Sequence, residues 1–151
     1  MPDRHGPLRP NRFKIELDGI TIGGFQRVEI PSKRTEQIEY REGNDPAHHK
    51  RLWGKNSYDD LIMERGAKKE NGDLYKWRKK VDEGKLDKAR KSVAVILQDE
   101  TGESHLRWEF TNAWPKEYQP PTLQSNTGAG QGNIATETYI VTFDEMTRKD
   151  V

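Results

Sequence analysis

The chain has 151 residues, the length of one domain, and its 26 basic and 25 acidic residues leave a net charge of +1. A near-neutral charge gives no general attraction to nucleic acid or to an anionic membrane. The sequence contains no cysteine, which excludes a disulfide framework, a thiolate nucleophile and a cysteine-ligated zinc site.

The composition is too polar for an ordinary monomer of this size, since hydrophobic residues make up 31% of the chain and charged residues 34%. Four Trp, five Tyr and four Phe, spread along the chain, argue against wholesale disorder. We therefore expect an ordered single domain over residues 1–151 that completes its burial by assembly. No apolar run of about 18 residues occurs, so we expect synthesis in the cytoplasm, no membrane anchor, and an extended N-terminal arm over residues 1–11.

Alternation of apolar and polar residues predicts short strands through the first half of the chain. These strands are expected at residues 12–18, 20–22, 25–30, 37–42 and 61–65. Between the last two, residues 40–58 are polar and rich in turn formers, and Trp53 stands alone among charged residues. A lone large aromatic residue in such a setting commonly anchors an interface, which predicts an extended loop or hairpin that reaches a neighbouring subunit.

A helix is predicted from about Asp73 to Glu83, because Leu74, Trp77 and Val81 recur three and four residues apart. Asp73 can act as its N-cap and Gly84 as its C-terminal stop. The apolar stripe is expected to face inward, while Arg78-Lys79-Lys80 face solvent or a surrounding protein.

The second half predicts three further strands, at residues 91–98, 104–113 and 135–143, with Pro115, Pro120 and Pro121 ending the second of them. In the last strand, Tyr139 and its alternate neighbours are expected to face the interior, and Glu137, near the strand start, is expected at a rim where it meets a basic partner or water. The opposite face is mostly hydroxyl-bearing and suits the wet wall of a lumen, with candidate lumen residues Thr136, Thr138 and Thr142.

Six to eight short strands with one inserted helix predict a mainly β fold, either an antiparallel barrel or a sandwich. The residues expected in its core are Phe13, Ile15, Leu17, Phe25, Trp77, Trp108, Phe110 and Trp114.

For each motif that could indicate catalysis, metal binding or cofactor binding, a purely structural interpretation explains the residues better. His48-His49 have no third ligand in view, and His105 has no evident partner for a catalytic triad. The alternating glycines of residues 128–132 lack the following helix and the lysine of a phosphate-binding loop. We expect no enzymatic activity and no cofactor; a small polar hydrolase or a carbohydrate-binding sandwich is the alternative from another class.

Several aromatic and glycine motifs occur together in one order along the chain. They are Phe13–Gly19 with Gly23-Gly24-Phe25, Ile38–Asn44, Leu52–Lys55, Leu61–Gly66, Leu74–Trp77 and Trp108–Lys116. Their order and spacing over residues 12–144 resemble the tail tube protein family of contractile phages and phage-tail-like contractile injection systems.

The resemblance implies a small β-barrel with one flanking helix, six-subunit rings that stack into a tube, and a final location in a phage tail or a similar particle. The implied partners are other copies of the chain, a sheath protein, baseplate or tube-initiator and tail-terminator proteins, and a cargo of DNA, tape measure or effector. The residues expected between subunits are Tyr40, Arg41, Glu42, Asn44, Trp53 and Lys55. The secreted tube protein of a type VI secretion system shares this fold and is the alternative within the same class.

Overall fold

The computed structural model describes residues 8–40, 50–69, 72–125 and 134–150, and of residues 40, 50 and 51 it describes the backbone alone. In chain order the elements are β1 (Phe13–Leu17), β2 (Ile20–Ile22), β3 (Phe25–Glu29), β4 (Lys33–Tyr40), β5 (Lys50–Tyr58), β6 (Leu61–Gly66), α1 (Asp73–Asp82), α2 (Leu86–Ala89), β7 (Lys91–Gln98), β8 (Ser104–Gln119), β9 (Thr136–Thr142) and β10 (Glu145–Asp150). The fold is therefore mainly β, as the alternating pattern predicted.

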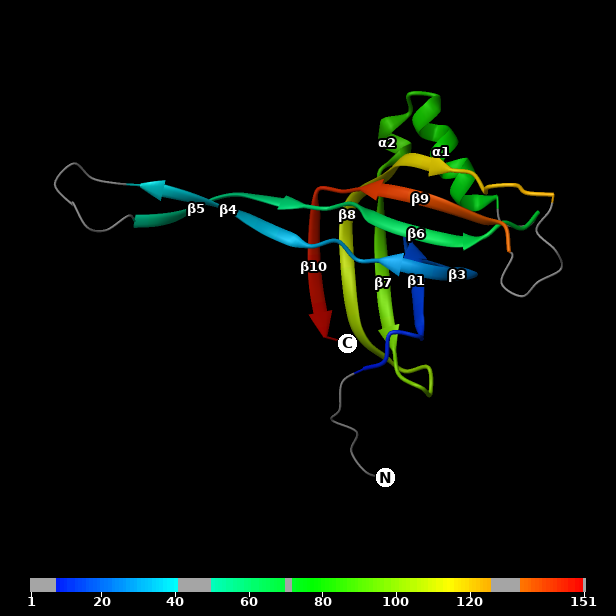
Figure 1. Cartoon of the computed structure of the whole chain (residues 1–151), viewed down its shortest axis with the longest axis horizontal. Coiled ribbons are helices and arrows are strands. Elements are labelled where there is room, and N and C mark those ends of the chain that lie inside the picture. The colour runs from blue at the N-terminus through cyan, green and yellow to red at the C-terminus, as the bar shows by residue number, and fades with distance from the viewer. Residues whose placement is uncertain (1–7, 41–49, 70–71, 126–133, 151) are drawn as a thin grey trace.

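The main sheet folds over itself so that two layers of strands enclose the core. Its antiparallel order is β2-β1-β7-β8-β9-β6-β3, and β10 pairs with β8. The long strand β8 links the layers, because its first part pairs with β7 and β10 and the part from Trp114 pairs with β9. In Figure 1 the strands β1, β7, β8 and β10 run upright, and β3, β6 and β9 cross in front of them.

The described strands do not close a barrel, which corrects the barrel expectation. The hydrogen-bonded path ends at β2 and β3, which share no pairing. Closure requires the first and last strands of a sheet to pair with each other. Here both end strands are short, with three and five residues, and each keeps one edge open within the described part of the subunit.

Two strand predictions are wrong at the C-terminal side. Pro115 does not end its strand, since β8 continues to Gln119 with a register shift between Pro115 and Glu117, and ends directly before Pro120-Pro121. Proline lacks the N–H group of a regular ladder and is tolerated at such irregularities. The strand β10 was not predicted, because its sequence is almost wholly polar; pairing with β8 from Glu145 to Asp150 gives it its strand conformation.

The residues expected in the core divide into three groups. Ile15, Leu17, Trp77 and Phe110 are buried in the main apolar cluster. Phe25 and Trp108 are partly buried and pack against that cluster, whereas Phe13 and Trp114 are partly exposed. The cluster is completed mainly by aliphatic residues of β6, β7 and β9, so the core depends less on aromatic residues than the sequence suggested.

The helical region differs from its prediction in its N-cap and in a second, short helix that follows α1. The N-cap of α1 is Gly72, so the predicted capping role of Asp73 is wrong. Gly84, with a positive φ of 73°, follows the helix as predicted. One helix was expected, but a second, the four-residue α2, follows it. The indole N–H of Trp77 donates a hydrogen bond to the carbonyl of Ala89 and holds α2 against α1.

Asp73 instead pairs with a buried cation. Arg65 of β6 is 1% exposed, and its Nη2 lies 2.5 Å from Oδ1 of Asp73. The guanidinium also lies 5.7 Å from the centre of the Phe25 ring. Partial burial by itself raises the pKa of Asp73, but the hydrogen bond and charge of Arg65 outweigh it and hold the pKa below its usual value.

Asp73→Asn is expected to destabilise the subunit by about 3 kcal/mol, the lower end of the range for breaking a buried pair, because Asp73 is itself half exposed. Its lowered pKa means that this stabilisation is present above the unfolded pKa of about 3.9 and is lost as the pH falls through the lower folded value. Urea unfolding between pH 2 and pH 7 measures both effects.

The matched control for that substitution is Asp82→Asn. Asp82 is exposed, and its ion pair with Arg78, at 3.3 Å, joins neighbouring turns of α1. Exposed pairs of this kind contribute about 0–1 kcal/mol. Equal losses of stability in the two variants would contradict the role assigned to Arg65 and Asp73.

Candidate assembly interface

The hairpin formed by β4 and β5 extends away from the rest of the molecule (Figure 1) and forms a separate two-stranded sheet. Its base is held by Arg34, whose Nη1 and Nη2 lie 2.7 Å and 2.9 Å from the two carboxylate oxygens of Asp59. The Tyr58 ring lies 5.2 Å from the Phe143 ring, which packs against the core. The hairpin is thus anchored to the body at one end only.

Trp53 lies on this hairpin and is 85% exposed. Lys55, which was also predicted to lie between subunits, is exposed two residues further along β5. Of Tyr40 the structure describes only the backbone, paired with Lys50, and Arg41, Glu42 and Asn44 lie outside the described residues. An exposed tryptophan costs a lone subunit free energy that a partner surface can recover.

Three strands of the main sheet offer further contact sites. The strands β2, β3 and β10 each pair on one side only within the described residues. An open strand edge presents a row of N–H and C=O groups that can pair with a strand of another chain. The subunit therefore carries several edges suited to pairing with other subunits.

The face of β9 away from the core holds the candidate lumen residues. Tyr139 and Val141 are fully buried, so the alternate positions Thr136, Thr138 and Thr142 lie on the opposite, partly exposed face. The register places Thr138 beside Glu64 of β6 and Gln119 of β8. Thr138 and these two neighbours are polar and suit contact with water, whereas Ile140 pairs with Ile62 further along the same face.

Glu137 lies at the start of β9, where we expected it to meet a basic partner or water. Its Oε2 accepts a hydrogen bond from the hydroxyl of Tyr139 at 3.1 Å. Burial, and then the Glu137 charge, raise the pKa of Tyr139 far above its ordinary value. The carboxylate is thus satisfied inside the subunit, and the tyrosine partner was missed because both residues lie on the same strand.

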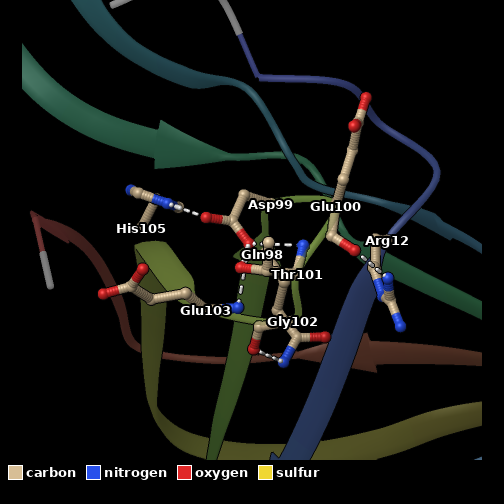
Figure 2. Close-up of polar contacts among 8 residues, drawn as sticks. All are labelled: Arg12, Gln98, Asp99, Glu100, Thr101, Gly102, Glu103 and His105. Atoms are coloured by element: carbon tan, nitrogen blue, oxygen red, sulfur yellow. Dashed lines mark hydrogen bonds and ion pairs between the residues drawn. The ribbon is translucent and has the colours of Figure 1, made fainter. Parts of the chain in front are cut away.

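The turn between β7 and β8 holds the one group of side chains in the described part of the chain that could act as metal ligands, Asp99, Glu103 and His105. Figure 2 shows the His105 ring directed at Asp99, with Nε2 and Oδ2 2.8 Å apart. No partner for His105 was predicted from the sequence, although the two residues flank the turn at Glu100–Gly102. Such pairs across a turn can be found from their spacing.

This group is accounted for by the structure of the turn. Oδ1 of Asp99 accepts hydrogen bonds from the backbone N–H groups of Thr101 and Glu103, at 2.9 Å and 3.0 Å, and from the Thr101 hydroxyl at 2.6 Å. The Thr101 hydroxyl and then His105 hold the pKa of Asp99 well below its usual range. No hydroxyl bonds to His105 in the part of the chain that the structure describes, so the pair lacks a nucleophile.

Other residues considered from the sequence lie outside the described residues, namely His48-His49, the glycines of residues 128–132 and most of the N-terminal arm. Of the three basic residues predicted to face solvent or another protein, Lys79 is exposed, while Arg78 and Lys80 are partly buried. Among the described helices, neither is long and apolar enough to cross a membrane.

Comparison with known proteins gives one family and one fold. The chain matches the family described as T4-like virus tail tube protein gp19 over residues 9–147. No curated protein sequence gives a significant match.

Several solved structures share the fold at low sequence identity. A chain of the PVC sheath–tube complex, from an extracellular contractile injection system, is 19% identical with a TM-score of 0.83 over 98% of this chain and 95% of that one. A chain of the anti-feeding prophage tube-terminating cap is 18% identical, with a TM-score of 0.79 over 97% and 93%. Hcp1 from Flavobacterium johnsoniae is 14% identical, with a TM-score of 0.55 over 92% and 97%.

Proposed function

The chain belongs to the T4-like virus tail tube protein family, and from that premise we propose that it is the subunit of the inner tube of a contractile phage tail or phage-tail-like injection particle. Copies join into six-membered rings, and the rings stack into a tube that conducts DNA, a tape-measure protein or an effector. The observation that carries the proposal is the projecting β4–β5 hairpin with its exposed Trp53.

The open edges of β2, β3 and β10 support ring formation. Pairing between subunits satisfies their backbone groups and joins neighbouring sheets into one wall, which removes the hazard of unpaired edges. Assembly also accounts for the polar composition, because burial is completed by contacts between subunits. The barrel that a single subunit leaves open is thereby closed by its neighbours.

The proposed partners follow from the position of such a tube inside a contractile particle. The proposed partners are a surrounding sheath, a baseplate or tube initiator, and a terminator that ends the tube. The resemblance to a chain from a sheath–tube complex and to a tube-terminating cap supports these partners. We propose assembly in the cytoplasm and a final location in the tail or tail-like particle.

Two alternatives are less well supported. The TM-score is 0.55 for Hcp1, against 0.83 and 0.79 for the proteins of extracellular injection particles, which supports the phage-like branch over a type VI secretion tube. The family is that of a structural tube protein, so the hydrolase and the carbohydrate-binding sandwich are not favoured.

Sedimentation velocity over a range of protein concentrations tests the proposal against the small enzyme and the carbohydrate-binding domain. Purified protein is expected to sediment as rings and larger stacks whose proportion rises with concentration. A small enzyme or carbohydrate-binding domain would remain a discrete species of 17.5 kDa. A concentration-independent monomer would overturn the proposal.

The lumen assignment predicts a size-dependent thiol reactivity at Thr138. The chain has no cysteine, so Thr138→Cys introduces the only thiol. In assembled tubes a small thiol reagent is expected to enter the lumen and react, whereas a reagent carrying a long polyethylene glycol chain is excluded. Both reagents should react with free subunits.

Lys79→Cys is the control for that experiment, because Lys79 is exposed on α1, which we place on the outside of the tube. In tubes without a sheath, both reagents should reach position 79. If the long reagent reaches position 138 and is excluded from position 79, the inner and outer faces of the subunit are exchanged.

A further inference from the structure

The two faces of the β4–β5 hairpin both carry exposed apolar side chains. Thr35 pairs with Asn56 and Gln37 pairs with Trp53, so β5 advances three residues while β4 advances two. The extra residue is a β-bulge in β5. Because of it, Trp53 shares a face with Gln37, and Leu52 lies on the opposite face, paired with Ile38.

The second face is built around a glycine. A Cβ atom at Gly54 would lie 3.0 Å from Cδ1 of Ile38 and 3.2 Å from Cβ of Glu36. Ile38 and Glu36 therefore lie directly over the Gly54 backbone, on the face that also carries Leu52. Ile38 is 45% exposed and Leu52 is 53% exposed, so this face offers a cross-strand apolar pair that stays about half exposed in the described subunit.

One flat contact cannot cover both faces of a ribbon. Trp53 lies on one side, and Ile38 with Leu52 lies on the other. A two-stranded hairpin is at best marginally stable in water without packing against other elements, and beyond its base the hairpin has no such packing in the described subunit. Contact with other copies on both faces would stabilise the hairpin and would cover its exposed apolar residues.

Other exposed apolar residues are available to contact the hairpin of a neighbouring copy. Leu123 and Ile134 are exposed, and they belong to the segments that follow β8 and precede β9. Figure 1 places these segments at the end of the molecule opposite the hairpin. Ile20, on the edge strand β2, is also exposed. A protrusion at one end and apolar residues elsewhere favour head-to-tail contacts, in which a copy uses different surfaces toward different neighbours.

From these observations we infer that, in the assembled tube, the β4–β5 hairpin is held between two other copies of this chain, one against the Trp53 face and one against the Ile38–Leu52 face. The inference rests on the proposed function and adds to it that the hairpin is buried from both sides. Alternation along β5 puts Trp53 and Leu52 on opposite faces, and the bulge sets the register in which Leu52, and not Trp53, shares a face with Ile38.

Adjacent residues on β4 provide the test without altering any apolar side chain. Glu36 lies on the Ile38 face and Gln37 on the Trp53 face, and both are exposed in the subunit. Glu36→Cys and Gln37→Cys each introduce a single thiol into a chain without cysteine. The rate of reaction with a small thiol reagent is measured in free subunits, in assembled tubes and in urea-unfolded chain as the reference.

Both thiols are expected to react in free subunits. In tubes each reaction should be at least roughly tenfold slower, because the surface of a neighbouring copy covers the thiol. Tubes in which one of the two thiols keeps its free-subunit rate would overturn the double contact while leaving the tube function intact. If the unsubstituted protein forms no tubes, the proposed function fails, and this inference fails with it.

Discussion

Replacing Trp77 with alanine is expected to leave the subunit largely unfolded. The side chain is 1% exposed and fills the space between α1 and the sheet. Truncation of a buried tryptophan costs about 3–5 kcal/mol, and loss of the indole donor leaves the buried carbonyl of Ala89 unpaired, which costs a further 1–3 kcal/mol or so. The two costs together, about 4–8 kcal/mol, equal most or all of the stability of a domain near the lower end of the usual range of about 5–15 kcal/mol.

Urea unfolding followed by far-ultraviolet circular dichroism measures the effect, at a concentration where subunits do not assemble. Trp77→Phe is the informative intermediate, because it keeps most of the packing and removes the hydrogen bond. The free energy of unfolding of Trp77→Phe should lie between that of the unsubstituted chain and that of Trp77→Ala. Cooperative unfolding of Trp77→Ala at nearly the original urea concentration would contradict the placement of α1 against the sheet.

Replacing Trp53 with alanine is expected to have the opposite outcome, a folded subunit that no longer forms tubes. Because the side chain is 85% exposed, its removal leaves no cavity in the subunit. Between subunits, by contrast, truncating a central aromatic anchor commonly costs 2 kcal/mol or more for each contact, roughly a thirtyfold loss of affinity. A tube repeats this contact in every subunit, so the loss accumulates along the assembly.

Sedimentation and thermal unfolding, measured on the same sample, separate the two roles of a tryptophan. Trp53→Phe should restore part of the assembly, because a phenyl ring still fills an apolar contact. Unchanged tubes together with a sharply lower unfolding temperature in Trp53→Ala would show that Trp53 supports the subunit itself.

Elements with a strong local pattern could be predicted from the sequence. The alternation of Phe13, Ile15 and Leu17 gives β1, and the spacing of Leu74 and Trp77 gives α1. These patterns reflect burial on one face, which the local sequence records directly. The hairpin was predicted from the opposite signal, an aromatic residue in a segment too polar to bury it.

The features that were missed depend on contacts between distant residues. The polar strand β10 forms because β8 offers it an edge. The ion pair of Arg65 and Asp73 joins a strand to a helix, and the propensity of Asp for N-caps pointed to a different role. The bulge that pairs Leu52 with Ile38 is a matter of register between two strands, and neither strand shows it alone.

Electron microscopy of the purified protein tests the central claim most directly. The account predicts rings of six subunits that stack into tubes with an open lumen, visible without sheath or baseplate proteins at high protein concentration. Particles of subunit size at every concentration, with no rings or filaments, would contradict it.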